Sequence, residues 1–76
     1  MRVAVYSPLP PQRSGIADYT AELLPALARH AELELVTEPG QSLASELARW
    51  PRRPVAELAR AIARGETDVV LYHLGN

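Results

Sequence analysis

The stretch that decides the fold is MRVAVYSPLPPQRSGIADYTAELLPALA, residues 1–28. Residues 2–6 within it form a short run that is rich in β-branched side chains and almost wholly apolar, which is typical of a strand covered on both faces. Residues 7–13 contain three prolines, which do not fit a helix interior or a central strand. The chain is therefore expected to leave the sheet as a loop after its first strand.

The segment that begins at Ser14 is predicted to form an amphipathic helix. Ser14 has the side chain of an N-cap. Pro25 removes one helical hydrogen bond, so we expect a kink between residues 21 and 25. The apolar residues that recur at helical spacing and define the expected buried face are Ile16, Tyr19, Leu23, Leu24, Leu27 and Ala28.

Two further strands are expected downstream. Residues 32–37, ELELVT, begin with strict alternation, which is typical of a strand with one solvated face at a sheet edge. Residues 69–72, VVLY, are continuously apolar and predict a second strand covered on both faces. The other expected elements are a short helix over residues 42–49, an extended link at 52–54, and a helix that starts at Pro54, buries Val55, Leu58, Ala59 and Ile62, and ends at a Gly65 cap.

This order of elements predicts an α/β fold, a three-layer Rossmann-like fragment with a short parallel sheet and right-handed helical crossovers. The second strand has the pattern of an edge, so the strand order 2-1-3 fits best. That order creates a switch point between the first and third strands, where open α/β sheets bind ligands beyond the carboxyl ends of the strands. The loops expected to meet there are residues 7–15 and 73–76.

Length and composition restrict the classes of protein. A chain of 76 residues without cysteine or a Cys/His cluster buries only about 60% of its unfolded surface, so it has little core of its own. It is therefore expected to be part of a larger domain. Eight basic residues, all arginine, oppose nine acids, and this balance gives no field to attract nucleic acid. No apolar run approaches the roughly 18 residues of a membrane span and no secretion signal is present, so a cytoplasmic location is expected.

The turn Ser14-Gly15-Ile16 is a candidate anion site. A helix N-terminus exposes unpaired N–H groups, and Gly15 allows a ligand close to the backbone, so phosphate binding is chemically reasonable. Arg13 lies beside it and carries a charge that a phosphate would attract. The alternative is an ordinary strand-to-helix turn with a serine cap and a solvated arginine. Neither a G-x-G-x-x-G fingerprint nor a Walker loop is present.

The segment His73-Leu74-Gly75-Asn76 follows directly after the last apolar strand. His73 could donate a hydrogen bond to a sugar hydroxyl or phosphate oxygen, or carry a proton. The alternative is a histidine bound to backbone at a strand end. Asn76 is included with it as a candidate ligand contact. Ser-His-Asp triads, paired carboxylates and metal-ligand spacings are all missing from the sequence, so neither metal nor cofactor is expected.

Three other side chains each have two interpretations. Asp18 in the first helical turn fits the helix dipole as well as a ligand contact, and Tyr19 fits core packing as well as a ligand contact. Trp50, flanked by arginines, could dock on an anionic membrane surface, or could simply cover the sheet with its arginines solvated.

Residues 1–28 together with DVVLYHLGN, residues 68–76, resemble the N-terminal domain of bacterial GT-B glycosyltransferases of family 4. The similarity covers nearly the whole chain and is weak over residues 38–54. The resemblance implies that residues 1–76 are part of an N-terminal, acceptor-side Rossmann-like domain, and that the C-terminal donor domain is missing from this chain. It also implies transfer of a hexose from a nucleotide-sugar to a saccharide or lipid-linked acceptor, with retention and without an obligatory metal.

The resemblance further implies roles for individual residues. Ser14-Gly15 matches the family's glycine loop, which approaches the donor diphosphate and the acceptor, although that loop often has two adjacent glycines. His73 matches a polar position, frequently histidine, that faces the cleft and is the expected catalytic residue. By itself the chain is expected to have no turnover. The competing hypothesis is a small non-enzymatic α/β binding or regulatory module that shares the pattern.

Overall fold

The computed structural model describes residues 1–12 and 15–73. Four strands alternate with helical segments, which confirms the predicted α/β class. The elements in chain order are β1 (Arg2–Tyr6), α1 (Gly15–Ala28), β2 (Glu32–Thr37), the 3-10 helix η1 (Ser45–Arg49), β3 (Arg52–Pro54), the 3-10 helix η2 (Val55–Glu57), α2 (Leu58–Ala63) and β4 (Val69–Tyr72).

All four strands are parallel and form one sheet in the order β3-β2-β1-β4. The predicted order 2-1-3 is therefore wrong in its number of strands, because the segment expected as an extended link is a strand. Residues 52–54 pair with β2, with Leu35 opposite Arg52. The other three strands keep their predicted neighbours, so β1 still lies between β2 and β4. The switch point beside β1 is confirmed.

The expected edge and interior strands are exchanged. β2 lies between β3 and β1, and its Leu35 and Val36 are fully buried. β4, which the sequence predicts to be covered on both faces, lies at the edge of the described sheet, and Val69 and Tyr72 are 42% and 55% exposed. The alternating pattern of β2 indicates a solvated face, but the Glu34 carboxylate is hydrogen-bonded by side chains within the fold and not by water.

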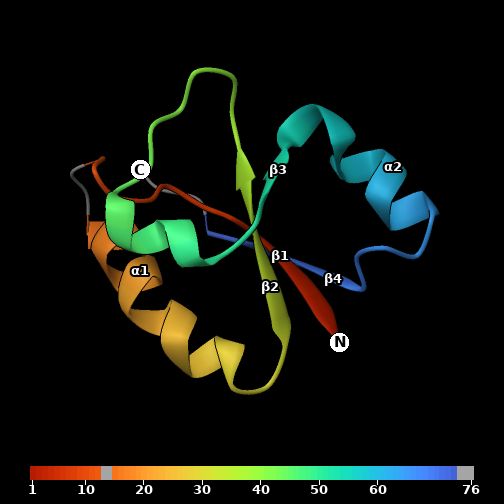
Figure 1. Ribbon diagram of the computed structural model, residues 1–76, viewed down its shortest axis with the longest axis horizontal. Coiled ribbons are helices and arrows are strands. Elements are labelled where there is room, and N and C mark those ends of the chain that lie inside the picture. Colours follow the sequence, from red (N-terminus) through yellow and green to blue (C-terminus); the bar gives the residue numbers. More distant parts are fainter. Residues whose placement is uncertain (13–14, 74–76) are drawn as a thin grey trace.

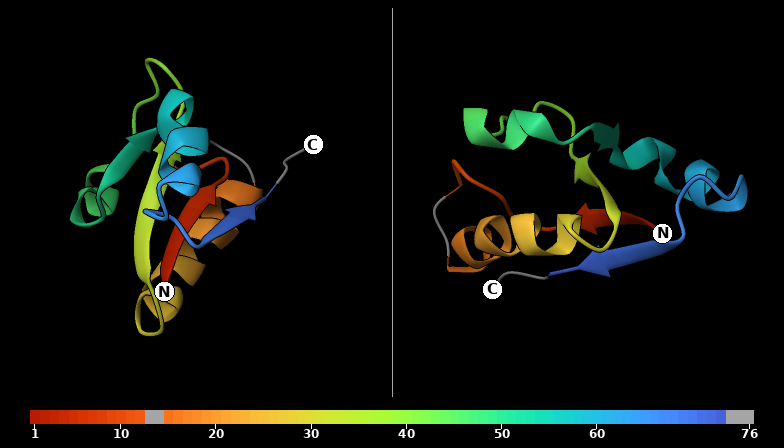
Figure 2. Two further views of the ribbon diagram at one scale, coloured as in Figure 1. Left: turned by 90° about the vertical axis from the view of Figure 1, so that its right-hand side faces the viewer. Right: turned by 60° about the horizontal axis from the view of Figure 1, so that its bottom comes forward.

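Helices cover both faces of the sheet and give it three layers (Figure 1). On one face α1 and η1 enclose the larger core, whose buried members are Val3, Val5, Leu9, Leu24, Leu33, Leu35 and Leu47. On the other face η2 and α2 cover a smaller cluster of Ala4, Val36 and Leu58. The arrowheads of β1 and β4 point the same way, so the segments that follow them begin at one edge of the sheet (Figure 2).

The buried face of α1 differs from the predicted one. Ala17, Thr20 and Leu24 are buried, whereas Tyr19 is 59% exposed, so the expectation that Tyr19 packs in the core is wrong. The helical period is correct, but the helix is rotated about its axis so that small residues face the sheet at its N-terminal end. Pro25 lies inside α1, which continues beyond it to Ala28.

The two shorter helical segments also differ from their expected form. The helix expected over residues 42–49 is the 3-10 helix η1 and starts at Ser45. The helix expected from Pro54 begins as η2 and becomes α-helical only over residues 58–63. Ile62, expected to be buried, is 48% exposed. Gly65 follows α2 with a φ of 72°, as a C-terminal cap requires.

Candidate functional site

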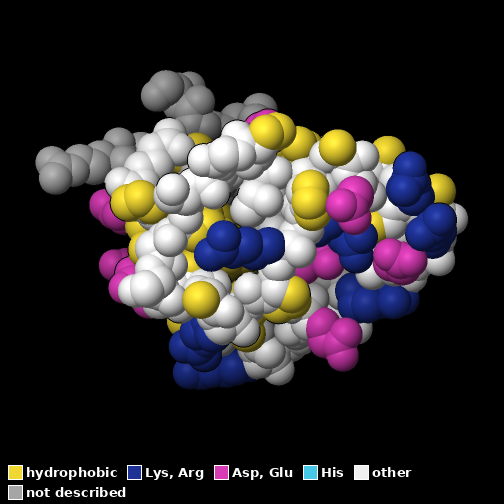
Figure 3. Space-filling view, turned by 45° about the horizontal axis from the view of Figure 1, so that its top comes forward, with side chains coloured by type: hydrophobic (Ala, Val, Ile, Leu, Met, Phe, Trp, Pro, Cys, Tyr) yellow, Lys and Arg dark blue, Asp and Glu magenta, His cyan; other side chains and the backbone are white. Residues whose placement is uncertain are grey.

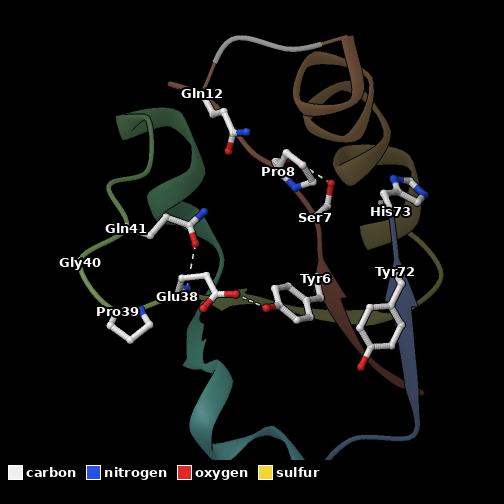
Figure 4. A pocket seen from close by; sticks show the side chains of 10 residues that line it. All are labelled: Tyr6, Ser7, Pro8, Gln12, Glu38, Pro39, Gly40, Gln41, Tyr72 and His73. Atoms are coloured by element: carbon white, nitrogen blue, oxygen red, sulfur yellow. Dashed lines mark hydrogen bonds between the residues drawn. The ribbon is translucent and has the colours of Figure 1, made fainter. Parts of the chain in front are cut away.

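A crevice of about 550 Å³ opens at the carboxyl ends of β1, β2 and β4 (Figure 4). Its volume lies within the range of small-molecule sites, and it lies where the strand order predicts ligand binding. The residues that line it are Tyr6, Ser7, Pro8 and Gln12 after or at the end of β1, Glu38, Pro39, Gly40 and Gln41 after β2, and Tyr72 and His73 at the end of β4.

Two tyrosines form one wall of the crevice. The register of β1 and β4 sets Tyr6 opposite Tyr72, and their ring centroids are 5.5 Å apart with a tilt of 47°. The Tyr6 hydroxyl donates a hydrogen bond to the Glu38 carboxylate (Figure 4). That bond holds the phenolic proton, so the pKa of Tyr6 is raised above its ordinary value of 10.0.

The opposite wall is a tight turn after β2. The Gln41 backbone amide donates a hydrogen bond to the Glu38 backbone carbonyl at 3.1 Å, and Gly40 has a φ of 75°. Proline at the second position and a glycine with positive φ at the third are typical of a type II turn. The Glu38 backbone amide also donates to the Gln41 side-chain oxygen at 2.9 Å. These bonds fix the Gln41 carboxamide at the crevice, and the Tyr6 hydroxyl holds the Glu38 carboxylate there.

His73 lies at the crevice, on the side away from Glu38 and Gln41 (Figure 4). Its backbone amide donates to the Tyr6 carbonyl at 3.1 Å, which extends the pairing of β1 and β4. Its ring nitrogen Nδ1 lies 2.8 Å from the Thr20 hydroxyl of α1. The predicted position of His73 at the switch point is thus confirmed, and its ring is held by a side chain.

Of the other predicted site residues, Gly15 and Ile16 are described, and neither lines the crevice. Gly15 is the exposed first residue of α1 and does not line the crevice. A Cβ atom placed on Gly15 would meet no atom of the described residues within 4 Å, so the described part of the fold does not require glycine there. Ile16 is partly buried in the first turn of the helix. The predicted contacts Arg13, Ser14 and Asn76 lie outside the described residues.

Several residues of the crevice were not identified from the sequence. Tyr6 and Tyr72 are each the last residue of a strand next to the switch point, and this position was a usable signal. Glu38 follows β2 directly, but its Pro-Gly neighbours marked only a turn. Thr20 gave no signal, because a polar residue on a helix is normally assigned to the solvent face.

The charge of the crevice disfavours anionic ligands. Among its described lining residues Glu38 carries the one formal charge, and it is negative. On the face in Figure 3, arginine and acidic side chains are interspersed at the α2 end and do not form a patch of one sign. Across residues 1–12 and 15–73, no three His, Cys, Asp or Glu side chains come close enough to hold a metal ion.

Trp50 packs partly buried against the larger core, with the Arg49 guanidinium 4.5 Å above its ring. Trp50 thus covers part of the core on one face of the sheet, and a cation–π contact with Arg49 stabilises it. Nor does any described helix have both the length and the apolar character needed to cross a membrane.

Comparison with known proteins found no family model, no curated protein and no solved structure that matches this chain.

Proposed function

We propose that this chain forms the acceptor-side part of a retaining hexosyltransferase, and that its crevice binds a saccharide or the saccharide portion of a lipid-linked acceptor. A second domain would hold the nucleotide-sugar. The observation that carries the proposal is the pairing of aromatic and polar walls around one switch-point crevice: Tyr6 and Tyr72 face Glu38 and Gln41.

This combination of side chains suits a sugar. A pyranose ring has an apolar face of C–H groups, which packs on exposed aromatic rings, and a rim of hydroxyls, which bind carboxylates and carboxamides. Tyr72 is 55% exposed, so its ring is accessible to a ligand. The Glu38 carboxylate can accept from hydroxyl groups, and it repels a phosphate. The charge therefore supports a neutral acceptor here and a donor diphosphate elsewhere.

The proposal is tested by following the backbone amides of the isotope-labelled chain by NMR during titration with neutral mono- and disaccharides. We expect shifts at residues 6, 38, 41, 72 and 73. Glu38→Gln should weaken binding about tenfold, since a hydrogen bond to a charged group is lost. Glu32→Gln is the matched control, because Glu32 is exposed and begins β2, beside Arg2 at the start of β1, at the end of the sheet opposite the crevice.

Two results would contradict the proposal. One is the absence of any response to saccharides, and the other is a response centred on the amino-terminal edge around Glu32. As a separate chain it should transfer no sugar, because the donor-binding residues are expected on the other domain. A measurable transfer rate from this chain would show that assignment of the donor site to be wrong.

A further inference from the structure

A chain of three polar side chains connects the loop after β1, the helix α1 and the end of β4. Thr20 is fully buried, and its hydroxyl oxygen lies 2.9 Å from Ser7 Oγ and 2.8 Å from His73 Nδ1. Ser7 is itself buried, and its hydroxyl donates to the Pro8 carbonyl at 2.8 Å. Buried polar atoms are normally paired, and this chain of bonds pairs all of them.

The direction of each bond follows from counting hydrogens. A hydroxyl has one hydrogen to donate. Ser7 gives its hydrogen to the Pro8 carbonyl, so Ser7 Oγ accepts at its contact with Thr20. Thr20 then donates to Ser7, so the Thr20 oxygen accepts from His73 Nδ1. Nδ1 must carry a hydrogen, and in a neutral imidazole the other nitrogen, Nε2, then has a free lone pair.

We infer that Ser7 and Thr20 are positioning residues that hold neutral His73 in the Nδ1–H form, so that Nε2 accepts a hydrogen bond from a ligand hydroxyl. Within the described part of the chain, no residue bonds to Nε2, and His73 is only partly buried at the crevice. The sequence alone suggests the opposite polarity, a histidine that donates to a hydroxyl or phosphate oxygen. The role of the ligand rests on the proposed function, whereas the tautomer does not.

The polarity of His73 matters for the class of ligand. A lone pair at Nε2 attracts a hydroxyl hydrogen and repels the oxygens of a phosphate. Together with the Glu38 carboxylate, it gives the crevice a second group that accepts hydrogen bonds. Both groups select a ligand that donates, as the neutral hydroxyls of a sugar do.

The tautomer can be read directly from long-range proton–nitrogen NMR correlations of the histidine rings at alkaline pH. His73 should show a protonated Nδ1 and an unprotonated Nε2. His30, exposed just beyond the C-terminal end of α1, is the internal reference. A His73 ring with its proton on Nε2 would overturn the inference.

Three variants test the cause. Thr20→Val keeps the shape of the side chain but removes the hydroxyl, so His73 should lose its preference and move toward the pattern of His30. Thr20→Ser should restore the pattern of the unmodified chain. Ser7→Ala removes the acceptor and releases the Thr20 hydrogen to donate to Nδ1, so the proton should move to Nε2. Persistence of the Nδ1–H form in Thr20→Val or Ser7→Ala would overturn the inference.

The variants also separate this inference from the proposed function. The tautomer is measured without a ligand, so it can be established even if no saccharide binds. Conversely, saccharide binding by a chain whose His73 carries its proton on Nε2 would leave the proposed function intact and remove this inference. Ser7→Ala covers the case in which Thr20→Val does not fold, because Ser7 lies in a loop and its methyl remnant fits the same space.

Discussion

The backbone amide of His73 donates a hydrogen bond to the carbonyl of Tyr6 at 3.1 Å, one residue beyond the last paired position of β1 and β4. This bond holds the first residue after β4 level with the end of β1. It keeps Tyr72 beside Tyr6, with ring centroids 5.5 Å apart, and it brings the His73 ring within reach of Thr20 on α1. One register between two parallel strands therefore creates both the aromatic wall of the crevice and the polar chain behind it.

The bond between Tyr6 and Glu38 should make the stability of the fold depend on pH in the alkaline range. The pKa of Tyr6 is raised above 10.0, chiefly by its hydrogen bond to Glu38. A group with a raised folded pKa stabilises the fold below its unfolded pKa, and this contribution is lost as the pH rises through the folded value. Glu38→Gln should lower the pKa of Tyr6, measured from the ring carbon signals of Tyr6 against pH. An unchanged titration of Tyr6 in Glu38→Gln would contradict the contact.

Asp68 should contribute an acid-dependent part of the stability. Its carboxylate accepts from the Arg2 backbone amide at 2.8 Å, and chiefly this bond lowers the pKa of Asp68 below 3.8. A lowered folded pKa stabilises the fold above the unfolded pKa, and the contribution disappears as the pH falls through the folded value. Asp68→Asn should flatten the pH dependence of urea unfolding at acid pH.

The side chain of Arg2 provides the control for Asp68. Arg2→Met removes the guanidinium, which lies 3.6 Å from the carboxylate, but leaves the backbone donor in place. Most of the acid dependence should therefore remain in Arg2→Met. If the acid dependence of the stability disappears in Arg2→Met, the charge of the Arg2 side chain, and not the Arg2 backbone amide, lowers the pKa of Asp68.

Two glycines should respond to alanine in opposite ways. Gly65 has a φ of 72°, and an L side chain at that angle costs about 1–2 kcal/mol. Gly15 is the first residue of α1, and no described atom lies within 4 Å of its Cβ position, so Gly15→Ala should leave the stability unchanged or raise it by about 0.5 kcal/mol. Chemical unfolding of the two variants measures both values. A loss of stability in Gly15→Ala equal to that in Gly65→Ala would contradict the helical start of α1.

Arg53 should be the residue that attaches β3 to the sheet. Its Nε lies 2.7 Å from Glu34 Oε1, and a second nitrogen lies 3.4 Å from Glu66. The same Glu34 oxygen accepts from the Thr67 hydroxyl at 3.0 Å. Because the Arg53 and Glu34 side chains are only 20% and 18% exposed, Arg53→Gln should lower the free energy of unfolding by about 1–2 kcal/mol.

The neighbouring Arg52 is the matched control for Arg53. It is exposed, so Arg52→Gln should change the stability by less than about 0.5 kcal/mol. A double-mutant cycle of Arg53→Gln with Glu34→Gln should give a coupling energy, whereas the cycle of Arg52→Gln with Glu34→Gln should not. Equal effects of the two arginine variants would contradict the assigned pairing.

Particular residues show how far sequence patterns reach. The spans of β1, β2 and β4 follow from their apolar and alternating runs, and the Gly65 cap follows from its position after a periodic segment. Glu34 shows the limit. Its alternation with leucines indicates a solvated face, but Arg53 and Thr67 cover it within the fold. A sequence pattern shows that a residue is polar, but it does not show whether water or another side chain is its hydrogen-bond partner.

The sequence by itself determined a parallel α/β sheet with a switch point beside β1 and with His73 at the end of a strand there. Only the tertiary structure decided that β3 joins the sheet, that Tyr6, Tyr72 and Glu38 share a crevice, and that Thr20 faces His73. The reason is physical. Periodicity determines which residues share a face, but the rotation of a helix about its axis and the contacts between residues far apart in the chain depend on how the small and large side chains of different elements pack together.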